Sequence, residues 1–131
     1  VGVTGNDTSV QRRALELGLV SIATANANLD GTGTIGTLYT AGADGAWVER
    51  ISMKAIVTTT AGMLRFFIHD GATYFLIHEE TVAAITKSAT VPAWEAEWFC
   101  RIKLQATYSL RVATEKAETF KVIAHAESLT G

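Results

Sequence analysis

The chain has few cysteines, few prolines and a modest share of charged residues. It contains one cysteine and one proline in 131 residues. A single cysteine cannot form an intramolecular disulfide, so packing must hold the fold together. The 11 basic and 13 acidic residues nearly balance, and no part of the chain shows the basic footprint of a nucleic-acid binder. No apolar run reaches the roughly 18 residues of a membrane-spanning helix. We therefore expect no nucleic acid and no membrane among the partners.

Hydrophobic residues, by contrast, are plentiful. They make up 48% of the chain, against 18% for charged residues. This composition excludes an intrinsically disordered protein, and the length suits one domain. The sequence therefore predicts a single folded domain with a substantial core.

Short β-prone segments alternate with glycine-containing turns from about residue 19 onward. The clearest pattern covers 94–104, where Trp94, Trp98 and Leu104 share one face with the apolar residues between them, a period of two that a helix cannot give. No segment has the length and period of a crossover helix, which disfavours a parallel sheet. We predict an all-β fold, an antiparallel two-sheet sandwich that is jelly-roll-like, with about eight strands and an N-terminal arm. The expected strands cover residues 20–24, 34–40, 47–57, 63–69, 73–79, 94–104, 108–114 and 119–126.

The same alternation predicts which side chains fill the core. Residues on the apolar face of each expected strand should point between the two sheets. They are Leu64, Phe66, Ile68, Trp98, Ile102, Leu110, Val112, Phe120 and Val122.

The first 18 residues are expected to form an arm, and residues 19–131 the sandwich domain. Residues 1–9 are polar and glycine-containing, with little to bury. Residues 10–17 are the one stretch that could be helical. Two charges and two apolar anchors lie close together in this arm and are the candidate partner-binding residues. They are Arg12, Arg13, Leu15 and Leu17.

One segment imitates a calcium-binding loop. Residues 26–31 place oxygen-bearing side chains at alternate positions before Gly31, but the bidentate acid required six residues later is replaced by Thr37. We therefore interpret the segment as a turn between strands. His69 and His78 could be cross-strand neighbours about the Asp70-Gly71 turn, yet a zinc site needs more ligands than are evident. We expect no metal and no cofactor.

Catalytic motifs are missing as well. There is no Gly-x-Ser-x-Gly elbow and no phosphate-binding loop. Glu95 and Glu97 share a strand face, as paired carboxylates of a glycosidase could, but Arg101 and Lys103 share it too. A solvated, charge-balanced sheet surface explains these residues better. We therefore expect no catalytic residues and no enzyme.

Trp94 and Trp98 offer an alternative function. If exposed, they could stack on sugar rings, as in carbohydrate-binding sandwiches; if buried, they anchor the core. Their register with Ile102 and Leu104 favours burial.

Three segments carry a resemblance: NLDGTGTIGTLYTAGADGAWVERI, GMLRFFIHDG and YSLRVATEKAETFKVIAHA. From about residue 26 to 127 the chain resembles small β-sandwich structural proteins of tailed-phage and prophage virions. The resemblance implies a capsid decoration (cement) protein, made in the host cytoplasm, that binds and stabilises the assembled head at the capsid surface. It also implies partners among the virion subunits, above all the major capsid protein, and a homo-oligomer, with a trimer favoured. A glycan-binding or receptor-binding module of a tail fibre or spike remains the alternative.

Overall fold

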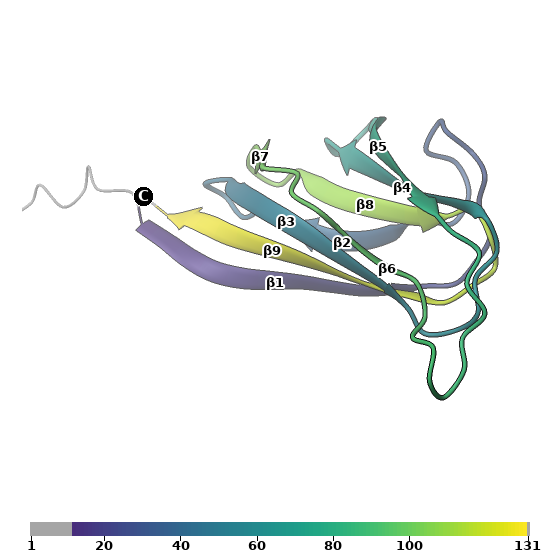
Figure 1. Cartoon of the computed structure of the whole chain (residues 1–131). Helices are drawn as coiled ribbons and strands as arrows, with labels where there is room; N and C mark the ends of the chain where they lie inside the picture. Colours follow the sequence, from purple (N-terminus) through teal and green to yellow (C-terminus); the bar gives the residue numbers. More distant parts are fainter. Residues whose placement is uncertain (1–11, 131) are drawn as a thin grey trace, which may run out of the picture.

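The computed structural model describes residues 12–130, with side chains for residues 13–129. These residues form nine strands and no helix (Figure 1). Within this range, no helix could cross a membrane. The strands are β1 (Arg12–Ile22), β2 (Gly36–Thr40), β3 (Ala46–Ala55), β4 (Gly62–His69), β5 (Tyr74–Val82), β6 (Glu95–Trp98), β7 (Ile102–Leu104), β8 (Ser109–Thr114) and β9 (Phe120–Thr130).

The strands form two antiparallel sheets that pack face to face, so the predicted all-β sandwich is confirmed. Sheet A has the order β1-β9-β3-β6, with the short β7 also paired to β3. Sheet B has the order β2-β8-β4-β5. In Figure 1, β1 and β9 lie along the lower side of the molecule, and β8, β4 and β5 of the second sheet lie above them.

The strand pairs are nested about the β4–β5 hairpin. This hairpin turns at Asp70, whose Oδ1 accepts hydrogen bonds from the backbone N–H groups of Ala72 and Thr73 at 2.9 and 2.7 Å. Outside it, β3 pairs with β6 and β7, β2 with β8, and β1 with β9. The chain therefore folds as one long hairpin wrapped into two sheets.

The predicted core residues lie between the sheets. Leu64, Phe66, Leu110, Val112, Phe120 and Val122 are fully buried, and Ile68, Trp98 and Ile102 are half-buried against them. Aromatic contacts join the two layers, because the rings of Phe66 and Trp98 lie 5.4 Å apart. The alternation of apolar residues therefore predicted the core correctly.

The expected strand over residues 94–104 is interrupted. It splits into β6 and β7, and Arg101 between them has a φ of 49°. The break lies beside a register shift in β3, between Val48 and Arg50. There the Arg101 N–H donates a hydrogen bond to the carbonyl of Glu49 at 3.2 Å. The extra residue of β3 breaks the ladder on its neighbour, as a β-bulge does.

The N-terminal boundary differs from the expected one at residue 18. Residues 12–18 belong to β1, and eleven consecutive residue pairs join β1 to β9. The helix considered for residues 10–17 is wrong over 12–17, because leucines at every second position suit a strand beside β9. Residues 1–11 of the expected arm lie outside the described residues.

Candidate interaction surface

A row of exposed leucines marks the outer face of β1. Leu15, Leu17 and Leu19 are 87%, 60% and 65% exposed. They alternate with residues that face sheet B, and they lie opposite Glu127, His125 and Ile123 of β9. We call these three residues the leucine row. Exposed leucines are unremarkable singly, but three in line form an apolar stripe that is typical of an interaction site.

Contacts on the inner face of β1 hold the leucine row outward. The backbone approaches β2 so closely at Gly18 that a Cβ there would overlap the carbonyl oxygen of Leu38. Glu16, two residues before Gly18, accepts a 2.5 Å hydrogen bond from the Tyr39 hydroxyl. Burial, and then the hydrogen bond and charge of Glu16, raise the pKa of Tyr39, so the phenol stays protonated and remains a donor. β1 is therefore fixed to the sandwich on one side and open on the other.

An open hollow of about 390 Å³ lies beside the leucine row. Leu15 and Leu17 supply apolar surface, and Glu49, Glu127 and His125 supply polar groups. Glu16 and Ala126 complete the lining. The surface at this point combines an apolar centre with an acidic margin.

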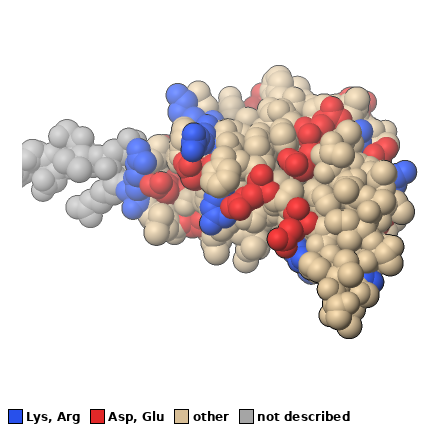
Figure 2. Space-filling view, viewed as in Figure 1, with Lys and Arg blue, Asp and Glu red and all other residues tan. Residues whose placement is uncertain are grey.

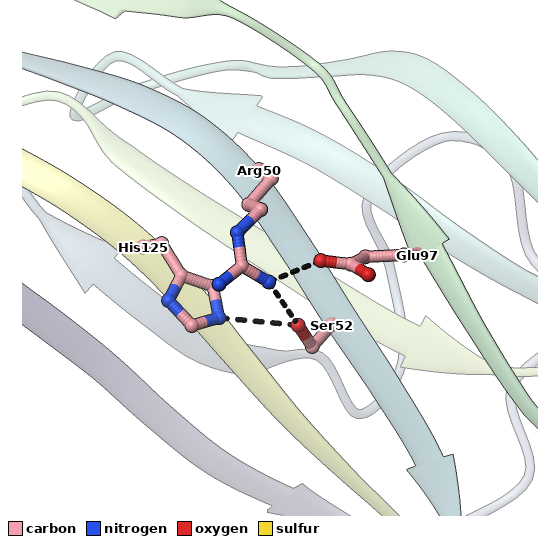
Figure 3. A network of polar contacts seen from close by, with 4 residues as sticks. All are labelled: Arg50, Ser52, Glu97 and His125. Atoms are coloured by element: carbon pink, nitrogen blue, oxygen red, sulfur yellow. Dashed lines mark hydrogen bonds and ion pairs between the residues drawn. The ribbon is translucent and has the colours of Figure 1, made fainter.

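A polar network crosses the same face of sheet A (Figure 3). Arg50 donates to Ser52 Oγ at 3.2 Å and forms an ion pair with Glu97. The Ser52 hydroxyl is also 3.1 Å from His125 Nε2. Burial, with the charge of Arg50 as the second cause, lowers the pKa of His125, and Glu97 acts in the opposite direction. The network links strands β9, β3 and β6 across the face.

The Ser52–His125 pair has the separation of a nucleophile and its base, but it lacks other parts of such a site. A catalytic base is normally oriented by a third group, usually a carboxylate. Among the described residues, His125 has a hydrogen bond to Ser52 and none to a carboxylate. The Ser52 hydroxyl already accepts from Arg50. In chemical terms the arrangement is a cross-strand polar contact.

Charges of both signs are interspersed over this face (Figure 2). Glu95 pairs with Lys54 at 3.0 Å and Glu97 pairs with Arg50. The sequence suggested that Arg101 and Lys103 balance these two glutamates. In the structure their partners come from β3 instead, and Arg101 pairs with Glu49 at 3.2 Å. The expected charge balance is present, with different partners.

The structure describes three of the four predicted partner-binding side chains. Arg13 is exposed and pairs with Glu127 at 3.4 Å. Leu15 and Leu17 lie together in the leucine row, while the side chain of Arg12 lies outside the described residues. The sequence reading missed Leu19, although the period of two that continues from Leu15 could have indicated it.

The calcium-like loop is a self-contained turn. Asn26 is buried and its amide donates to the carbonyls of Thr32 and Thr34 at 2.9 and 3.0 Å. Its Oδ1 accepts from the backbone of Asn28. Gly31 has a φ of 91°, as the turn requires. The Asn26 side chain thus forms its hydrogen bonds within the loop itself.

His69 and His78, which the sequence allowed to be cross-strand neighbours, do not lie opposite each other. The tight turn after Asp70 places His69 opposite Tyr74, while His78 lies opposite Phe66. His78 stacks on Trp98, with ring centroids 3.9 Å apart. In residues 12–130 no cluster of three or more histidine, cysteine or acidic side chains could hold a metal ion.

The two tryptophans do not form a flat exposed platform. Trp94 is buried and meets Phe120 edge-on at 5.8 Å. Trp98 is covered on one side by His78 and packs against Phe66. The sugar-stacking arrangement considered from the sequence therefore has no support in this geometry.

Comparison with protein-family models finds no match for this chain, and neither does comparison with curated proteins.

Proposed function

We propose that this chain is a non-enzymatic structural protein of a tailed-phage virion, a decoration protein that binds and stabilises the capsid from outside. The leucine row carries the proposal: Leu15, Leu17 and Leu19 project from a strand that pairs with β9 along its whole length. An apolar stripe on a firm sheet suits contact with another protein surface. The partners are the major capsid protein or other virion subunits.

The order of the strands supports this assignment. When β7 is counted as a continuation of β6, the strand orders β1-β9-β3-β6 and β2-β8-β4-β5 support a jelly-roll-like sandwich. Jelly rolls are frequent in viral capsid and lectin domains. A fold alone does not fix a function, so the proposal depends on the surface and on the sequence resemblance as well.

The charge pattern of sheet A fits a protein that docks without strong electrostatic steering. Lys54, Arg50 and Arg101 each pair with an acidic residue on the same face. Such pairs are screened by solvent and leave no large field of one sign. Apolar contact at the leucine row would then decide where the protein binds.

Mass spectrometry of purified particles tests the proposed location. We expect many copies of the chain on each head. A chain absent from particles, or present in a few copies at the tail, would contradict a decoration role.

The leucine row is tested by adding purified protein to particles that lack it. The double variant Leu15→Ser, Leu17→Ser should bind much less, while Leu29→Ser, at a 53% exposed leucine in the β1–β2 loop, should bind like the unmodified protein. Equal binding by both variants would show that another surface contacts the capsid.

A further inference from the structure

We propose that β1 pairs with β1 of a second copy, antiparallel and about a two-fold axis at Leu17, so that the two A sheets form one continuous sheet. The proposal gives the free edge of β1 a partner, a second copy of the chain. It concerns the contact between copies and does not depend on the particle to which they bind.

β1 differs from every other sheet edge in the described residues. It is eleven residues long and pairs with β9 without a register shift. The edge strand β2 is five residues long and irregular between Thr37 and Tyr39. The edge strand β5 has a register shift in its pairing with β4. The edge strand β6 is four residues long and contains two glutamates. Short length, bulges and charge are the usual means of blocking edge pairing. β1 has the length and regularity that favour pairing.

The leucine row is self-complementary about Leu17. Antiparallel pairing centred there places Leu17 opposite Leu17 of the second copy and Leu15 opposite Leu19. Side chains directly opposite on one face of an antiparallel pair lie about 4.5–5.5 Å apart at Cβ and contact each other. All three leucines of each copy therefore meet leucines, and six form one apolar patch on the joined sheet.

The two neighbouring registers are less favourable, one because of charge and the other because of a lost apolar contact. Centring on Glu16 would place two glutamates directly opposite each other, which is destabilising. Centring on Gly18 would place Leu15 opposite Ser21 and leave it without an apolar partner. With the axis at Leu17, Glu16 lies opposite Gly18 and Arg13 opposite Ser21, so no two like charges meet.

The neighbouring edge of sheet B does not oppose this approach. β2 packs close to β1 at Gly18 and contains no charged residue. Glu16, the one acidic side chain of β1, already accepts the hydrogen bond of Tyr39. A two-fold contact of this kind is isologous and closes at a dimer, whereas a cyclic trimer would need β1 to meet a different surface.

Sedimentation of the full chain over a range of micromolar concentrations tests the state of assembly. We expect a monomer–dimer equilibrium, with Leu17→Arg monomeric and Leu29→Arg, the matched control at another exposed leucine, unchanged. Thermal unfolding of both variants checks that they fold. Leu17→Ser, which keeps a small neutral side chain, should weaken the dimer without removing it. A monomer at all concentrations, or a trimer, would overturn the proposal.

Cysteine cross-linking tests the register in a Cys100→Ala background. We expect Leu17→Cys to form a disulfide-linked dimer, and Leu15→Cys to cross-link with Leu19→Cys but not with itself. Self-linking of Leu15→Cys in place of Leu17→Cys would refute the register. Both measurements are made without particles, so a failure here is separate from failure to bind capsids.

Discussion

The fold changes the ionisation of His125 within the physiological pH range. Burial and Arg50 lower its pKa, so the folded chain binds a proton at this site less readily than the unfolded chain. Its contribution to stability is therefore present above the unfolded pKa of about 6.5 and is lost as the pH falls below it. We expect the urea midpoint of His125→Gln to fall less than that of the unmodified protein between about pH 7.5 and pH 5.5. Equal falls in both proteins would mean that His125 does not contribute to the acid sensitivity.

Single residues were predictable where one local pattern decides their place. Phe66 and Val122 lie in the core because every second residue of their strands is apolar. His78, by contrast, stacks on Trp98 of the other sheet. That contact depends on how β5 and β6 meet across the sandwich, which no local pattern contains. For the same reason, the sequence could not show that Arg50 and Lys54 would pair with Glu97 and Glu95.

Gly18 decides whether β1 can lie against β2. A Cβ at this position would overlap the Leu38 carbonyl and lie 2.8 Å from Tyr39 Cβ, so one of the strands would have to move. We expect Gly18→Ala to destabilise the protein by about 1–3 kcal/mol, as overpacking of a filled site does. Chemical denaturation measures the change.

Gly42→Ala is the matched control for this prediction. A Cβ at Gly42 would meet no atom within 4 Å. This variant should unfold close to the unmodified protein. Similar losses in both variants would show that the close approach at Gly18 does not limit the packing of the two sheets.

The elements themselves were largely predictable, and the errors have structural causes. Six of the expected strands, from 34–40 to 119–126 but without 94–104, overlap single strands of the structure. The stretch 94–104 kept its alternation but was broken opposite the bulge near Glu49, a feature of its neighbour. The sequence predicted the first strand, β1, only from about residue 20, because the residues before it could also form a short helix. β1 is a strand because it pairs with β9, whose residues lie 98 to 118 positions later in the chain.

At the scale of the whole molecule, the strand order predicts where the fold opens last. β9 and β3 lie inside sheet A, and β8 and β4 inside sheet B, so each is hydrogen-bonded on both sides. Residues 86–92, all exposed, project from the sandwich in the segment that joins β5 to β6 (Figure 1). We expect amide hydrogen exchange to be slowest in β3, β4, β8 and β9 and fastest in residues 86–92. Exchange in β4 or β9 as fast as in β6 would show that the two sheets do not open as one unit.

The nested pairing also sets an order of events during synthesis. β9 is made after the other eight strands, yet it lies between β1 and β3. At the usual rate of translation, β1 waits on the order of ten seconds for this partner to emerge from the ribosome. Until then sheet A cannot close, and the edge of β1 that later pairs with β9 is available to chaperones or to nascent neighbours. The hairpin of β4 and β5 can form early, so the chain is expected to fold from its middle outward and to finish by inserting its last strand.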